Sequence, residues 1–90
     1  MTELLARLGL ARLHGEEDSD GEFVCEISDA DDFGKVYSTL EANKELVYLE
    51  ESSTLNIENG SQVYRLGDQY QITLIADFAV DVYRLVITTL

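Results

Sequence analysis

The second half of the chain alternates apolar and polar residues over several short runs, and this pattern limits the possible folds most. Within residues 69–76 (QYQITLIA), every second residue from position 70 is apolar. A period of two is typical of a β-strand with one buried face. The pattern predicts strands at 45–50, 53–58, 61–66, 69–76 and 79–88.

The connections between the first four of these runs are two residues long: Glu51-Ser52, Asn59-Gly60 and Gly67-Asp68. Asn-Gly favours a type I′ turn and Gly-Asp a type II′ turn, the two turns typical of tight hairpins. A less defined turn is expected near Asp77-Phe78. Because short connections join antiparallel strands, these residues predict an antiparallel meander of four to five strands, paired in order.

The first half has a different period. Residues 2–13 carry leucines at helical spacing and are followed by His14-Gly15, so a helix is expected there. Residues 22–28 (EFVCEIS) alternate and predict a strand with Cys25 on its apolar side. Residues 29–43 predict a second helix, with acidic residues in the first turn, where negative charge complements the helix dipole.

The predicted fold class is therefore α+β. We expect an N-terminal helix, a strand, a second helix and then the β-meander, with the helices on one face of the sheet. A chain of 90 residues is long enough for one modest core. Residues 1–90 are therefore expected to form a single compact domain.

The charge balance restricts the possible partners. Eighteen acidic residues and six basic ones give a net charge of −12. Such a chain repels nucleic-acid phosphates and anionic lipids, so we expect no direct binding to nucleic acid or to a membrane, and basic proteins become the natural partners. A solvated surface adapted to solubility or to high salt is the alternative explanation of the acidity.

The acidity is concentrated between residues 15 and 32, a segment with no lysine or arginine. Carboxylates spaced i, i+4 on a helix or i, i+2 on a strand can imitate a row of phosphates. The candidate partner-binding residues in this segment are Glu16, Glu17, Asp18, Asp20, Glu22, Asp29, Asp31 and Asp32. Later acids that could extend the row are Glu41, Glu45, Glu50 and Glu51.

The stretch GEEDSDGE at 15–22 partly matches a calcium-binding EF-hand loop. Ligand-type residues and a glycine fall in register from Glu16, but position 12 is Ile27 where the motif needs a bidentate glutamate. The sequence therefore predicts no metal and no cofactor. The single histidine, His14, and the single cysteine, Cys25, form no catalytic set, so no enzyme is predicted, and a metal-dependent or catalytic domain is the least favoured alternative.

A lone cysteine favours a reducing compartment. The first residues, MTELLARLGLARL, are too interrupted by charge for a signal peptide, and no apolar stretch reaches the length of a membrane span. We therefore expect a soluble, cytoplasmic protein.

Residues 20–42, with Asp20-Gly21, Val24, the run DDFGKV and then LEA, resemble a segment of the YebC-type translation and transcription factors. The resemblance covers about a quarter of the chain. It implies a βαββαβ domain whose second helix would fall on residues 60–78, where this sequence instead alternates.

In its small size, its strong acidity and its lack of a catalytic set, the chain is similar to the phage and mobile-element inhibitors that imitate nucleic acid, such as anti-CRISPR proteins. The expected function is a non-enzymatic inhibitor or immunity-type protein that binds a basic nucleic-acid-binding enzyme. Two alternatives remain: a structural or assembly module that forms a homodimer through its sheet, and a YebC-like factor.

Overall fold

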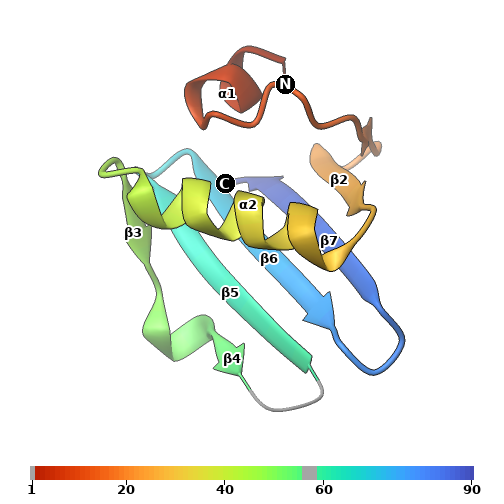
Figure 1. The fold of residues 1–90 in the computed structure, drawn as a ribbon. Helices are drawn as coiled ribbons and strands as arrows, with labels where there is room; N and C mark the ends of the chain where they lie inside the picture. The colour runs from red at the N-terminus through yellow and green to blue at the C-terminus, as the bar shows by residue number, and fades with distance from the viewer. Residues whose placement is uncertain (1, 56–58) are drawn as a thin grey trace.

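The computed structural model describes residues 2–55 and 59–90, which fold into two α-helices, one 3-10 turn and a seven-stranded antiparallel sheet (Figure 1). The elements are α1 Thr2–Arg7, β1 Glu16–Glu17, β2 Glu22–Ile27, α2 Ala30–Ala42, β3 Leu46–Tyr48, η1 Glu50–Ser52, β4 Thr54–Leu55, β5 Asn59–Leu66, β6 Tyr70–Asp77 and β7 Val82–Thr89. The α+β class and the position of the helices on one face are confirmed.

The strand order is β1-β2-β7-β6-β5-β3, with β4 also paired to β5. Strands β5, β6 and β7 are paired in chain order and form a three-stranded meander, whereas four to five strands were predicted. The Gly67-Asp68 turn is confirmed: Gly67 has a φ of +56°, and the Gln69 N–H donates to the Leu66 carbonyl at 3.3 Å. The last strand of the meander, β7, also pairs with the much earlier β2, from Glu22 opposite Thr88 to Ile27 opposite Tyr83.

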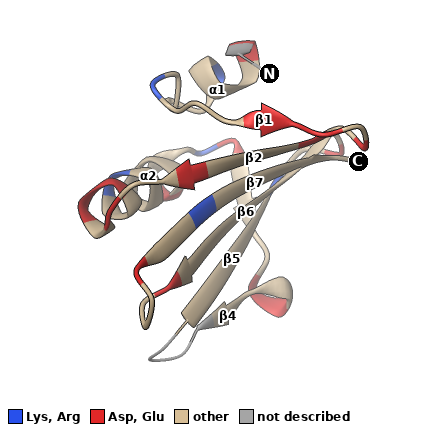
Figure 2. Cartoon of the chain, turned by 90° about the vertical axis from the view of Figure 1, so that its right-hand side faces the viewer, with Lys and Arg blue, Asp and Glu red and all other residues tan. Residues whose placement is uncertain are grey.

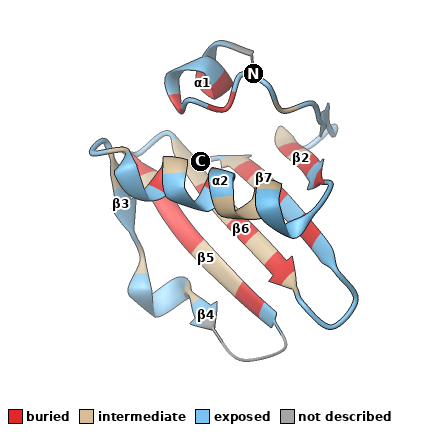
Figure 3. Ribbon diagram, viewed as in Figure 1, coloured by how far each residue is buried: buried red, intermediate tan, exposed pale blue. Residues whose placement is uncertain are grey.

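The core lies between the sheet and the helices. Helix α2 crosses one face of the sheet, and α1 lies above α2 in the views of Figures 1 and 3. Residues facing the helices are buried on every long strand, as at Cys25, Leu85 and Ile72, and they form one cluster with Val36 and Leu40 of α2. Burial of this apolar surface is the main contribution to the stability of the fold.

The first helix is shorter than predicted. Helix α1 ends at Arg7, and Gly9 follows with a φ of +77°, a conformation that glycine adopts without strain. Leu8 and Leu10 are nevertheless fully buried, at 1% and 0% exposure. The leucines of residues 2–13 that define the apolar pattern are thus largely buried. The continuous helix predicted for this range is wrong, because the chain turns at Gly9.

Two predicted hairpin turns are wrong. Asn59 and Gly60 lie inside β5, where they pair with Asp77 and Ala76 of β6. The expected turn at 51–52 is part of η1, and β3 and β4 both pair with β5 instead of with each other. The predicted strand 53–58 survives as β4, and its last residues, 56–58, lie outside the described residues.

Between its pairings with β3 and β4, the edge of β5 forms hydrogen bonds with the backbone of Leu49 and the side chain of Ser53. The Leu49 N–H donates to the Val63 carbonyl at 2.8 Å, and the Val63 N–H donates to Ser53 Oγ at 3.0 Å. The second helix that the YebC resemblance implies for residues 60–78 is also wrong, because β5 and β6 occupy this range. Neither helix in the described part of the chain is long and apolar enough to cross a membrane.

Candidate functional site

The stretch GEEDSDGE folds as a tight β-hairpin. The Asp18 N–H donates to the Glu22 carbonyl at 2.9 Å, and Asp18 Oδ1 accepts from the N–H groups of Asp20 and Glu22 at 2.9 and 3.0 Å. Aspartate commonly stabilises turns in this way. Gly21 has a φ of +80°. The Asp18 carboxylate is therefore directed at the backbone of its own hairpin.

Strand β1 forms one edge of the sheet and carries exposed Glu16 and Glu17 opposite Val24 and Phe23 of β2. Its position depends on Gly15. A Cβ at Gly15 would overlap the Val24 carbonyl oxygen and the Phe23 ring. Glycine is therefore required for the chain to pass this close to β2, and this approach fixes where the two glutamates lie.

The other predicted acids surround the start of α2. Asp29 is the N-cap, and its Oδ1 accepts from the Asp32 N–H at 2.8 Å. The Ser28 hydroxyl donates to Asp32 Oδ2 at 3.0 Å, and Asp31 is exposed in the first helical turn. An N-cap carboxylate and acids in the first turn stabilise a helix. Asp29 and Asp32 thus have structural partners as well as negative charge.

The structure separates the eight predicted residues into two groups. Glu16, Glu17, Asp18, Asp20 and Glu22 lie together in the β1–β2 hairpin, whereas Asp29, Asp31 and Asp32 lie at the start of α2. Because β2 has six residues, the turn of the hairpin and the start of α2 are roughly 20 Å apart. Between them, Glu26 Oε1 accepts from Arg84 Nε at 2.9 Å. We call the first group the acidic edge; Figure 2 faces it.

The later acids do not extend this edge. Glu45 pairs with Arg7 at 3.1 Å, and Glu41 accepts a hydrogen bond from the Tyr64 hydroxyl at 3.0 Å. Glu50 and Glu51 lie in η1, beside β5, whereas β1 lies at the opposite edge of the sheet. A single continuous row of carboxylates along the molecule is therefore not formed by the described residues.

The potential catalytic and metal-binding side chains are dispersed. Within the described ranges, no group of three or more His, Cys, Asp or Glu side chains is arranged to hold a metal ion. Cys25 is 1% exposed and belongs to the core cluster, and burial raises the pKa of its thiol. A raised pKa lowers the thiolate fraction, so Cys25 behaves as a small apolar residue.

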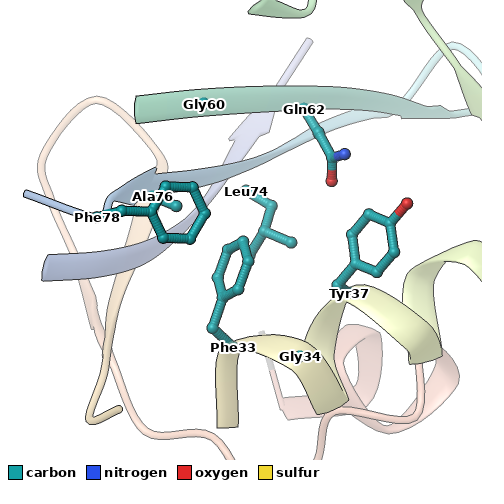
Figure 4. Close-up of a pocket in the computed structure, with 8 residues that line it drawn as sticks. All are labelled: Phe33, Gly34, Tyr37, Gly60, Gln62, Leu74, Ala76 and Phe78. Atoms are coloured by element: carbon teal, nitrogen blue, oxygen red, sulfur yellow. The ribbon is translucent and has the colours of Figure 1, made fainter. Parts of the chain in front are cut away.

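A second feature, which sequence reasoning missed, is a cavity of about 260 Å³ between α2 and strands β5 and β6. We call it the α2 cavity (Figure 4). Its walls are mainly apolar and include Phe33, Tyr37, Leu74 and Phe78. The Gln62 side chain points into it from β5, and Gln62 Oε1 is buried with no hydrogen-bond partner among the described residues. Gly34, a glycine within a predicted helix, was the sequence feature that could have indicated this space.

No protein-family model, no curated protein and no solved structure matches this chain. A function can therefore be proposed only from the surfaces and cavities of the molecule itself.

Proposed function

We propose that this is a small, non-enzymatic protein that binds a basic, nucleic-acid-binding protein through the acidic edge and inhibits it. The observation that carries the proposal is the β1–β2 hairpin, which holds exposed carboxylates at the outer edge of the sheet, in a segment without lysine or arginine. Such an edge offers a partner closely spaced negative charges.

The rigidity of the hairpin supports this role. Two backbone N–H groups donate to the Asp18 carboxylate, and the lack of a side chain at Gly15 lets the chain pass close to β2 just before β1. The carboxylates of Glu16 and Asp20 are therefore carried on a fixed backbone. A preorganised surface loses less conformational entropy on binding than a flexible acidic tail. A basic groove that normally holds phosphates would be complementary to it in charge.

The acids at the start of α2 contribute at longer range. Asp29, Asp31 and Asp32 are roughly 20 Å from the turn of the hairpin, so a partner must be large to reach both groups. A nucleic-acid-binding groove is long enough for this. The charge of the α2 group also adds to the field that guides a basic partner toward the protein.

The experiment is affinity capture from lysate at about 0.1 M and about 0.5 M salt, with identification of retained proteins by mass spectrometry. We expect a basic nucleic-acid-binding protein at low salt, lost at high salt and displaced by duplex DNA. The test variant is the double substitution Glu16→Lys and Asp20→Lys, which leaves the Asp18 turn intact. It should abolish retention.

The matched control is Glu50→Lys with Glu51→Lys, which makes the same change of charge at the opposite edge of the sheet. This variant should retain the partner. Equal retention by both variants would show that the acidic edge is not the contact surface. Equal loss would show that net charge alone determines binding. Inhibition is then tested by titrating the protein into the purified partner's nucleic-acid-binding assay.

A second candidate is a self-associating module, favoured by the face of the sheet opposite the helices. Val24, Val86 and Thr73 are consecutive neighbours across three strands on that face. Val82 is 40% exposed on the same face. A homodimer formed there would persist at high salt and be broken by Val86→Lys. Sedimentation showing a monomer at millimolar concentration would remove this candidate.

A further inference from the structure

The glycine in the second turn of α2 has no local structural reason. Glycine lowers helix stability relative to alanine, and it is usually required only by a positive φ or by a close neighbour. Gly34 is not among the residues with positive φ, and a Cβ built on it would meet no atom within 4 Å. Its missing side chain instead leaves space above β5 and β6, and this space is part of the α2 cavity.

The cavity contains one polar group without a partner. Gln62 lies on the face of β5 that is covered by α2, next to Leu74 of β6 in the strand register. Its Oε1 is buried and accepts no hydrogen bond from the described residues. An unpaired buried acceptor is costly, and native structures rarely keep one without a reason. A donor from a bound molecule would satisfy it.

The remaining walls suit a flat ring. Phe33 packs edge-on against Phe78, with ring centroids 6.0 Å apart and an angle of 89°. Tyr37 and Phe78 are 36% and 45% exposed, so large aromatic side chains border the opening while Leu74 lies behind them (Figure 4). Aromatic walls pack favourably on the face or edge of a ligand ring.

We propose that the α2 cavity binds a small, uncharged, ring-containing molecule whose single N–H or O–H group donates a hydrogen bond to Gln62 Oε1. The proposal concerns a site separate from the acidic edge, and it does not depend on the function proposed above. Pockets of this kind, mainly apolar with one or two placed polar groups, are typical of small-molecule sites.

Size and charge define the ligand class further. An apolar cavity of about 150 Å³ holds benzene, so one of about 260 Å³ has room for two fused rings. None of the described residues that line the cavity is charged, so these walls would offer an entering ion no counter-charge for the hydration it loses. The net charge of −12 also repels anions. Indole, an uncharged bicycle with one N–H donor, meets these requirements.

The test is a titration of the full chain with indole, followed by amide chemical shifts. The control ligand is 1-methylindole, which keeps the rings and lacks the donor. We expect shifts concentrated in α2, β5 and β6, with indole bound about threefold to tenfold more tightly than 1-methylindole, as one hydrogen bond would give. The substitution Gln62→Met keeps the side-chain length, removes the acceptor and should equalise the two affinities.

The position of the site is tested separately. Gly34→Leu should fill the cavity and abolish indole binding, whereas Ser38→Leu, on an exposed position of the same helix, should leave it unchanged. Indole binding by the Gly34→Leu variant at unchanged affinity would overturn the proposal. So would an absence of shifts around the cavity in the unmodified protein, or equal affinities for the two ligands before Gln62 is replaced.

Discussion

The two sides of α2 cover the sheet in different ways. On the side facing the N-terminal segment, Val36 and Leu40 are 0% and 1% exposed, and a Cβ on Gly9 would lie 3.1 Å from Thr39 Cγ2. On the other side, Phe33, Gly34 and Tyr37 line the α2 cavity. One helix on one sheet therefore has a filled side and a hollow side.

The difference shows what closes a two-layer α+β core. A single helix is too narrow to cover a seven-stranded sheet. On the filled side, Leu8 and Leu10 add a further apolar layer. On the hollow side nothing equivalent is present in the described residues, and at Gly34 the helix lacks a side chain that would reduce the space. Stability and the proposed ligand site are thus assigned to opposite sides of the same helix.

The largest expected effect is on the filled side of α2. Leu40→Ala should lower the free energy of unfolding by about 2–5 kcal/mol, because it removes a fully buried side chain and leaves a cavity. Tyr37→Ala, on the hollow side, should cost clearly less, since its ring is partly exposed. Urea denaturation of both variants measures the difference. Equal losses would contradict the assignment of a filled and a hollow side.

The next effect is expected at Gly15, which lies close to β2. Gly15→Ala should destabilise the protein by roughly 1–3 kcal/mol, since the new Cβ must displace the Val24 carbonyl or the Phe23 ring. Thermal unfolding gives the shift in midpoint. A stability unchanged from that of the original protein would mean that the β1 segment moves aside easily, and it would weaken the case for a rigid acidic edge.

A smaller effect is expected at Tyr64, whose hydroxyl donates to Glu41 of α2 at 3.0 Å. Tyr64→Phe should cost about 1 kcal/mol at neutral pH. Burial, and then the bond to Glu41, raise the pKa of Tyr64 above its ordinary value near 10. Above pH 10 the unfolded chain therefore loses this proton while the folded chain keeps it, and stability falls.

Urea midpoints measured between pH 8 and about pH 11 test this dependence. The decline above pH 10 should be steep in the original protein and shallower in Tyr64→Phe. Parallel curves for the two proteins would show that the other tyrosines cause the alkaline loss.

The smallest effect has the opposite sign. Gly34→Ala should raise the free energy of unfolding by roughly 0.5–1 kcal/mol, because alanine favours the helix and its Cβ meets no neighbour. Calorimetric midpoints measure it, with Ser38→Ala as a control on the exposed side of α2. A destabilised Gly34→Ala variant would show that the space beside this glycine is needed for folding.

Much of the sheet could be predicted because its strands combine a period of two with clear turns. Strand β6 and the Gly67 turn follow directly from local residues. The turn predicted at Asn59-Gly60 was wrong because pairing with β6 outweighs the local preference of these two residues for a turn. Both residues lie in β5. The pairing of β2 with β7 had no local indication, since it joins segments far apart in the chain.

The site was predictable only as a list of acids. Their type and density are visible in the sequence, but the separation of the hairpin acids from Asp29, Asp31 and Asp32 depends on the length of β2. The α2 cavity was not predictable, because it requires knowing that Gln62 and Gly34 face each other across the two layers. In the sequence, Gly34 indicates only a weaker helix.

The pairing of β2 with β7 also affects how the chain folds. Glu26 and Arg84, which meet across these strands, are 58 residues apart in sequence. Contacts of this separation give a high contact order, and such topologies fold slowly because loop entropy is lost before the pairing is gained. During synthesis, β2 leaves the ribosome well before β7, so the edge of β2 that pairs with β7 is at first unpaired. We expect the dense negative charge beside β2 to reduce aggregation at that stage, since like charges keep exposed strand edges of neighbouring chains apart.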